Sequence, residues 1–268
     1  MRCVNKVQDI GIIAGISILA MLLRYFYVNC YLFGGEEVLI TETGIFQLYF
    51  GGLLLEQSFD LISISLQMLI VILETVALVS DLHNGTIENL DILICRVSNR
   101  GVLYRNLIGQ VMLRNMILIA FDYSLFMLLE KTKPCSVQIS ILMMLFLQIV
   151  LLELVYFTID FAFGIVYGYI FMLLFHFSPV IFIGFMYANG SDLWCIGKRF
   201  WFQCGIYNWF HSLSVVYVES GVKWDTIAYQ MTDSNTVANL VLPFFVTAIL
   251  SLCLYAAGKI CFQKTEII

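Results

Sequence analysis

Charged residues are scarce in this chain of 268 residues, and so are proline and histidine. Asp, Glu, Lys and Arg make up 12% of the sequence and hydrophobic residues 61%, whereas a soluble domain carries roughly 25% charged residues. A globular surface needs more charge than this, and a disordered chain needs low hydrophobicity. Both classes are therefore excluded, and lipid is the expected solvent for most of the chain.

Several motifs of enzymes and nucleic-acid-binding proteins are also missing. The net charge of −5 gives no basic footprint for nucleic acid, and the eight cysteines contain no CxxC pair that would indicate zinc. There is no H-E-x-x-H or G-x-S-x-G motif, and the three histidines are far apart in the sequence. We therefore expect no catalysis, metal or cofactor on this chain.

Long apolar runs dominate what is present. Six stretches reach the length of about 20 mostly apolar residues that a membrane-crossing helix needs. They cover approximately residues 10–32, 61–80, 108–129, 137–158, 163–188 and 237–258. The expected fold is an all-α polytopic membrane protein with six transmembrane helices, formed as a single transmembrane domain over residues 1–268.

Two shorter runs are ambiguous. Residues 44–55 are too few to cross a bilayer, so we interpret them as a re-entrant or interfacial piece. Residues 200–218 are almost long enough, but they include Gln203, Asn208 and His211. We favour re-entrant or interfacial structure there over a seventh span.

The distribution of Lys and Arg predicts the orientation, because these residues concentrate in cytoplasmic loops. With six spans, seven of them fall on one side of the membrane: Arg2, Lys6, Arg96, Arg100, Arg105, Lys259 and Lys264. The loop from 34 to 60 has none. Five others fall on the opposite side: Lys131, Lys133, Lys198, Arg199 and Lys223. The balance predicts that both termini are cytoplasmic.

The segment 81–107, between the second and third spans, has the pattern of a short amphipathic helix. Thr86 is a favourable N-cap residue, and Glu88 suits the first turn of a helix. Apolar residues then recur at helical spacing until residues 98–101 interrupt the pattern. Two readings remain open: the helix anchors a loop at the interface, or it transmits a force to both adjoining spans.

The same segment resembles the permeases of type-2 ABC exporters. The matching residues are Asp81, Gly85-Thr86, Glu88, the run Leu90–Cys95, Val97-Ser98, Arg100 and Arg105. The layout is similar as well, with six spans, internal termini, a helix between spans two and three, and an external segment before span six. Two departures are the absence of the proline common before the Ser-x-Arg portion, where Arg96 lies here, and the short stretch ahead of the first span.

The resemblance implies a division of labour between subunits. Two ATP-binding cassette subunits would hold ATP and magnesium, because this chain has no GxxxxGK[ST] phosphate-binding loop. A second copy of the permease, or a paralogue, would complete the path. The segment 81–107 would be the coupling segment, whose ATPase-contacting residues would be Thr86, Glu88, Asn89, Asp91, Arg96, Arg100 and Arg105.

Ionisable residues inside the expected spans are costly and commonly face protein or water. Relative position along the spans predicts a pair between Arg24 and Asp122, and a contact of Arg114 with Glu74 or Glu153. These charges either satisfy packing between spans or line a path for substrate, which would then comprise Glu74, Glu153, Arg114 and Gln67.

Small residues at GxxxG spacing indicate sites where helices approach closely. The chain has this spacing at Gly11 and Gly15 and again at Gly164 and Gly168. Chance matches are common in apolar sequence, and such contacts would occur within one chain or between two.

The segment 189–236 is long and rich in aromatic residues. The resemblance suggests re-entrant external helices there, with a gate formed by Trp194, Trp201, Phe202, Trp209 and Phe210. Plain anchoring at the membrane interface is the alternative, since aromatic side chains are enriched there. Cys195 and Cys204 would form a disulfide if the outer side is oxidising.

The function expected from the resemblance is that of the membrane-spanning subunit of an ATP-driven exporter in a bacterial cell membrane. An apolar interior suits an amphipathic or hydrophobic cargo, and we favour a peptide such as a toxin or bacteriocin. Lipid, drug or ion export is an alternative, and so is an ion-coupled secondary transporter or channel. The latter commonly has an internal repeat, which is not seen here.

Overall fold

A computed structural model describes residues 2–32, 46, 49–50, 53–54, 62, 65–66, 69–70, 72–76, 100–131, 136–188, 215–216 and 233–264. These residues form an almost entirely helical architecture. Four helices are long and apolar enough to cross a membrane, over Ile10–Cys30, Arg100–Glu130, Gln138–Phe163 and Phe244–Lys264. The chain is therefore a helical membrane protein in its general character.

The described elements follow the order of the sequence. Helix α1 covers Arg2–Tyr25 and continues as the π-helix η1 over Phe26–Leu32. A second π-helix, η3, covers Ile72–Val76. The remaining long helices are α6 (Arg100–Glu130), α7 (Ser136–Phe163), α8 (Ile165–Ala188) and α11 (Asp233–Lys264).

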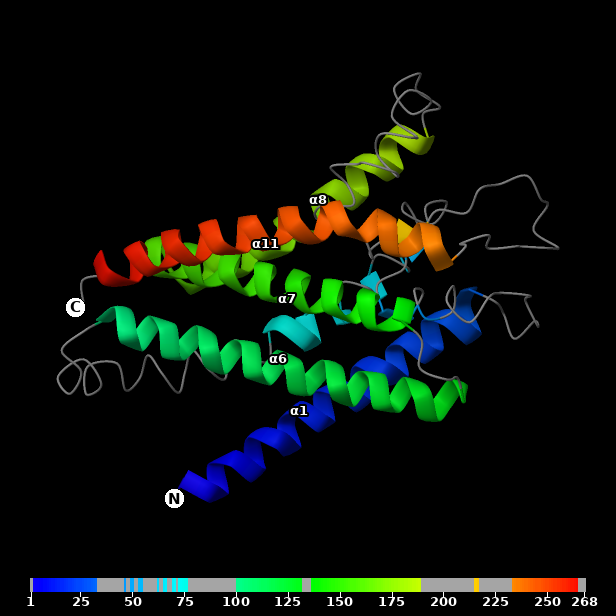
Figure 1. The fold of residues 1–268 in the computed structure, drawn as a ribbon, viewed down its shortest axis with the longest axis horizontal. Coiled ribbons are helices and arrows are strands. Elements are labelled where there is room, and N and C mark those ends of the chain that lie inside the picture. The colour runs from blue at the N-terminus through cyan, green and yellow to red at the C-terminus, as the bar shows by residue number, and fades with distance from the viewer. Residues whose placement is uncertain are drawn as a thin grey trace.

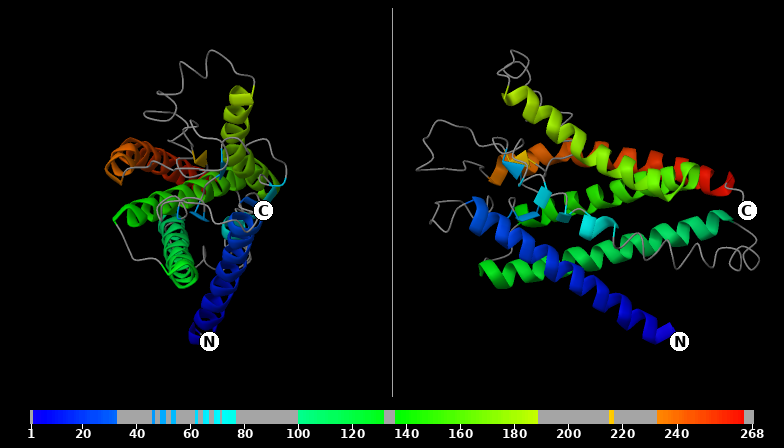
Figure 2. Two further views of the ribbon diagram at one scale, coloured as in Figure 1. Left: turned by 90° about the vertical axis from the view of Figure 1, so that its right-hand side faces the viewer. Right: turned by 180° about the vertical axis from the view of Figure 1, so that it is seen from behind.

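Helix α7 is the centre of the bundle. It packs extensively against α8 and α11 and also contacts α6, while α1 crosses α6 at an angle (Figure 1). Figure 2 shows the same arrangement from two further directions. Every residue of α7 from Gln148 to Phe157 is buried, which explains why its apolar residues show no single lipid-facing stripe.

Helices α7 and α8 are joined by one residue, Gly164. Its φ of 101° is a left-handed conformation that side chains disfavour, and its N–H donates to the Asp160 carbonyl oxygen at 2.8 Å, which caps α7. Four residues on, Gly168 faces Tyr156, and an added Cβ would lie 3.1 Å from the Tyr156 carbonyl oxygen. The Gly164–Gly168 spacing thus serves a close contact within this chain.

Most helix boundaries lie beyond those expected from hydropathy. Helix α6 begins at Arg100, eight residues before the expected start at 108, so Arg100 and Gly101, which were expected to interrupt a helix, form the first turn of α6. The reason is that hydropathy marks only the lipid-buried part of a helix, whereas helical hydrogen bonds continue into its polar end. Helix α7 continues to Phe163, five residues past the expected end at 158, and α11 extends from Asp233 to Lys264 rather than from 237 to 258.

Two segments expected outside the bilayer meet in a short strand pairing. Leu53–Leu54 (β1) pairs in parallel with Val215–Val216 (β2), with Leu53 opposite Val215. This two-residue pairing is the described exception to an all-helical fold. It connects the 44–55 run to the long aromatic segment, which the sequence had not indicated.

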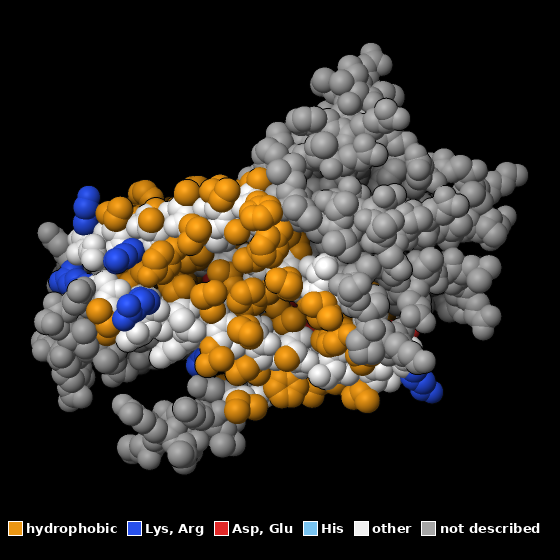
Figure 3. All heavy atoms as spheres, in the orientation of Figure 1, with side chains coloured by type: hydrophobic (Ala, Val, Ile, Leu, Met, Phe, Trp, Pro, Cys, Tyr) orange, Lys and Arg blue, Asp and Glu red, His pale blue; other side chains and the backbone are white. Residues whose placement is uncertain are grey.

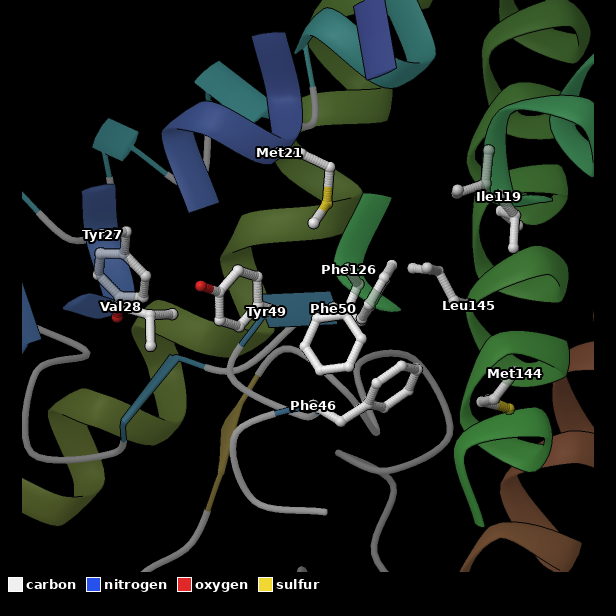
Figure 4. Packing of buried hydrophobic residues seen from close by; sticks show 11 residues of the cluster. Met21, Tyr27, Val28, Phe46, Tyr49, Phe50, Ile119, Phe126, Met144 and Leu145 are labelled. Carbon is white, nitrogen blue, oxygen red and sulfur yellow. The ribbon is translucent and has the colours of Figure 1, made fainter. Parts of the chain in front are cut away.

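The 44–55 run also contributes to the hydrophobic core. Phe46 and Phe50 are fully buried and lie edge-on to Phe126 of α6 at ring-centroid distances of 5.0 and 5.6 Å. Figure 4 shows these rings gathered with Tyr49 between α1 and α6. The three side chains are inserted among the helices, so this part of the run does more than cover an interface.

The outer surface of the described helices is apolar, and its charges are at the ends. Leu22, Leu113, Leu174 and Leu252 are each 57–69% exposed, as expected for side chains that face lipid. Figure 3 shows this apolar band, with basic residues gathered at the end where α6 begins and α11 ends. The N and C termini lie at the same end of the molecule (Figure 1).

Candidate functional site: charges buried between the helices

Arg24 is the centre of a buried charged cluster, which we define as Ser17, Arg24, Glu74 and Asp122. The Arg24 guanidinium lies 2.5 Å from Glu74 Oε1 of η3 and 3.0 Å from Asp122 Oδ2 of α6. The Ser17 hydroxyl donates to the other Asp122 oxygen. The three ionisable side chains are only 1–5% exposed, so α1, η3 and α6 are connected by charges that are sealed from solvent.

The guanidinium also has an aromatic neighbour. Its Cζ lies 5.3 Å from the centroid of the Phe50 ring, within the range of a cation–π contact. Phe50 comes from the 44–55 run, so this run covers the cluster as well as filling the core. Because buried charges are costly unless paired, each of these contacts offsets part of the desolvation of Arg24.

Two π-helical segments adjoin the cluster. Glu74 is the central residue of η3, and η1 begins two residues after Arg24. A π-turn widens the helix and re-aims the side chains around it, and such turns occur frequently at functional sites. The regular α-helical pattern is thus interrupted at η1 and at η3, next to the side chains that form the cluster.

The pair between Arg24 and Asp122 is the one that relative depth had suggested, but Glu74 lies elsewhere than expected. Even spacing along span two placed Glu74 at the level of Arg114, nearer the cytoplasmic end. In the structure it contacts Arg24 instead. That estimate assumed parallel helices of regular rise, whereas α1 is tilted against the others (Figure 2) and Glu74 lies in a π-turn.

A second polar contact lies between α6 and α7. Asn115 Nδ2 donates to Glu153 Oε2, and both residues are at most 1% exposed. The other amide atom, Asn115 Oδ1, is buried without a hydrogen-bond partner among the described residues. The contact of Arg114 with Glu153 stays a prediction.

Tyr49 connects three segments at the end of α6. Its hydroxyl accepts a hydrogen bond from Asn29 Nδ2 of η1 and donates one to Glu130 Oε1, each at 2.7 Å. Burial, and then the hydrogen bond to Glu130, raise the pKa of Tyr49, so the phenol remains a donor. The 44–55 run is thereby attached to both α1 and α6 beside the charged cluster.

The two basic coupling candidates that are described lie at the opposite end of α6. Arg100 is half-buried, and its guanidinium donates to the Gln263 carbonyl oxygen of α11 at 3.2 Å. Arg105 is exposed. Arg100 therefore has a role inside the chain, whereas Arg105 is open to a partner.

Most other predicted site residues lie outside the described residues. This applies to the coupling residues Thr86, Glu88, Asn89, Asp91 and Arg96 and to the path residue Gln67. It applies equally to the gate residues Trp194, Trp201, Phe202, Trp209 and Phe210 and to the cysteines Cys195 and Cys204. These predictions stay predictions.

Comparison of the chain with protein-family models, with curated proteins and with solved structures found no match. The class that the fold defines is thus a helical membrane protein whose described part has four candidate spanning helices and a buried cluster of charges.

Sequence reasoning missed the neutral partners of the site. Ser17 and Asn115 are polar residues within apolar runs, and each lies seven residues from the charged position that defined its neighbourhood. Two helical turns separate such residues on the same face, so this spacing was the available signal for Ser17 and Arg24, and for Asn115 and Asp122. Nothing in the sequence pattern indicated that Phe50 would cover Arg24.

Proposed function

We propose that this chain is the membrane-spanning subunit of an ATP-driven exporter, paired with a separate ATP-binding cassette ATPase. The observation that supports it best is the continuity of α6. This helix starts at Arg100, inside the proposed coupling segment, and runs to Glu130 without a break. At 1.5 Å per residue its 31 residues span about 46 Å, enough to cross the bilayer with a turn or more to spare.

A continuous helix is a suitable lever. A force applied to residues 81–99 would reach Arg100 directly and travel along α6 to Asn115 and Asp122, the two positions where α6 holds its buried polar contacts. Movement of α6 would therefore strain its contacts to α1, span two and α7 at the same time. The continuity of α6 supports the interpretation of this segment as a coupling element and not only as a loop anchor.

The remaining parts of the proposal concern assembly and cargo. Two copies of the permease, or one copy and a paralogue, would enclose the path with two ATPase subunits that hold ATP and magnesium. The cargo would be an amphipathic or hydrophobic molecule, most simply a peptide such as a toxin or bacteriocin, with lipid, drug or ion as alternatives. The location would be a bacterial cell membrane, with both termini cytoplasmic.

The path residues need a conformational change in order to meet cargo. Glu74 and Glu153 are 3% and 1% exposed, and Glu74 is already paired with Arg24. Arg114 is half-buried on α6. Within the proposal, separation of α6 from α7 would open the route, and Arg114 and Glu153 would line it.

The test is co-purification of the chain with ATP-binding cassette subunits of the same cell. Arg105→Glu reverses an exposed charge in the coupling segment, and Lys264→Glu is the matched control, because it reverses an exposed charge near the end of α11. Arg100→Glu is less informative, since it also removes the contact to Gln263. We expect the ATPase with the wild type and with Lys264→Glu, and its loss with Arg105→Glu.

An ion-coupled transporter or channel is the second candidate, favoured by the buried Arg24 cluster, because intramembrane charges also mark ion and proton pathways. Reconstituted vesicles separate the two functions. Uptake that needs ATP and the ATPase supports the exporter, whereas uptake driven by an ion gradient through this chain alone would overturn it. Absence of any associated ATPase under gentle extraction would count against the exporter as well.

A further inference from the structure

The hydrogen bonding between Asn115 and Glu153 is incomplete if Glu153 is ionised. Asn115 Nδ2 donates to one oxygen of the carboxylate, but the neighbouring amide oxygen, Asn115 Oδ1, is buried and lacks a donor in the described part of the chain. Buried acceptors without a donor are rare in folded proteins, and each one costs free energy. An ionised Glu153 cannot supply the donor, because a carboxylate only accepts.

A proton on Glu153 would complete the contact. A carboxylic acid and a carboxamide form a ring of two hydrogen bonds: the amide N–H donates to the acid's carbonyl oxygen, and the acid's O–H donates to the amide oxygen. The first of these bonds is present. Protonation of the other Glu153 oxygen would provide the second, satisfy Asn115 Oδ1 and remove a charge from the interior of the bundle.

We propose that Glu153 and Asn115 form a proton-binding site that is occupied while α6 and α7 are in contact. The inference does not depend on the exporter assignment, because it rests on this contact alone. A site of this kind links movement of α6 to proton release, since separating the helices breaks the ring and admits water to the carboxyl group.

Other polar and charged groups lie on the helices around α7. Arg114 of α6 is half-buried and leaves the helix about 100° away from Asn115. On α7 the next acidic residue is Asp160, two turns on; α8 contributes the buried His176, and α11 the neutral hydroxyls of Thr247 and Ser251. Glu74 is held by Arg24. Glu153 is completely buried, and the amide oxygen of Asn115 lacks a donor in the described part of the chain. For these two reasons we expect Glu153 to hold a proton, although the half-buried cation of Arg114 lies on the neighbouring helix.

Infrared spectroscopy of the chain in lipid nanodiscs tests the proposal. At neutral pH the spectrum of the wild type minus that of Glu153→Gln should contain the carbonyl stretch of a carboxylic acid, shifted by exchange into deuterium oxide. Asn115→Leu should retain this band but move it to higher frequency, because the bond to the acid's carbonyl is lost. Glu74→Gln is the control, since it reports on the Arg24 cluster and should leave the Glu153 band in place.

A difference spectrum that contains carboxylate bands in place of the acid band would overturn the proposal. Thermal stability gives an independent reading, because glutamine is a neutral mimic of the protonated acid and can make both bonds of the ring. Glu153→Gln should therefore match or exceed the unfolding temperature of the wild type, and a clear decrease would also contradict the site. If a variant fails to insert, a pH titration of the wild-type acid band replaces it, and absence of that band at every pH refutes occupancy.

Discussion

Replacing Arg24 with methionine is expected to destabilise the protein strongly. Methionine keeps the length and the apolar stem of the side chain but removes the cation that lies 2.5 Å from Glu74 and 3.0 Å from Asp122. Both carboxylates are 5% exposed or less, so water cannot take the place of the guanidinium. The two carboxyl groups would then have to bind protons or face each other as buried charges without a counter-ion, and either outcome costs stability.

The magnitude follows from the behaviour of buried ion pairs. Removing one partner of such a pair costs about 3–5 kcal/mol, mainly because an uncompensated charge remains inside. Arg24 serves two carboxylates, so we expect a loss in the upper half of this range. At about 2–4 °C per kcal/mol for a chain of this size class, the unfolding temperature should fall by roughly 8–20 °C.

The assay is the fraction of protein that stays monodisperse after heating in lipid nanodiscs, followed by gel filtration. Leu22→Ala is the matched control, because Leu22 lies on the same helix, two residues away, and is 58% exposed. Its side chain faces outward, so its loss should change stability by no more than about 0.5 kcal/mol.

Neutralising the carboxylates should reverse the effect. In Arg24→Met combined with Glu74→Gln and Asp122→Asn, no buried charge is left, and most of the lost stability should return. Neighbouring residues in one network are strongly non-additive, which is what this rescue measures. An Arg24→Met protein as stable as Leu22→Ala, or a triple variant no better than Arg24→Met alone, would refute the view that the cluster is held by charge pairing.

Three further substitutions test packing near the two ends of the bundle. Gly258→Ala should cost about 1–3 kcal/mol of stability, because the new methyl group would collide with the Tyr104 hydroxyl and lie 2.9 Å from Thr158 Oγ1. Tyr104→Phe in the same chain should restore only part of the loss in a heating assay, because the Thr158 contact remains. Gly11→Ala should be neutral or gain up to about 1 kcal/mol, since nothing lies within 4 Å of the added carbon; a decrease confined to a dimeric fraction would instead place Gly11 between two copies. Tyr49→Phe should lose about 1.5–3 kcal/mol through its bond to Glu130, and an unchanged unfolding temperature would show that this bond is unimportant.

The sequence predicted the spanning helices well where hydropathy is continuous. The described spans over α1, α6, α7 and α11 coincide with four of the six expected stretches, because about 20 apolar residues leave few alternatives to a membrane helix. Hydropathy says less about polar ends, so α6 was expected to begin at 108 rather than at Arg100. It also carries no information on long-range pairings such as Leu53 with Val215.

The candidate site was predictable in its charges but not in its full geometry. Arg24 and Asp122 are conspicuous in apolar surroundings, and similar depth indicated that they would meet. The position of Glu74 depends on the tilt of α1 and on the π-turn of η3, neither of which has a reliable sequence signal. The orphan oxygen of Asn115 depends on the orientation of one amide, which only three-dimensional packing determines.

The one-residue turn at Gly164 has a consequence for how the protein enters the bilayer. No Lys or Arg lies between Lys133 and Lys198, so the α7–α8 hairpin has no basic residue of its own to set its direction of insertion. Only Gly164 separates the two helices, so there is no polar loop that could remain in water while one helix inserts into the bilayer alone. They should therefore enter as a pair during biogenesis and take their direction from α6 and α11, whose basic ends are made before and after them.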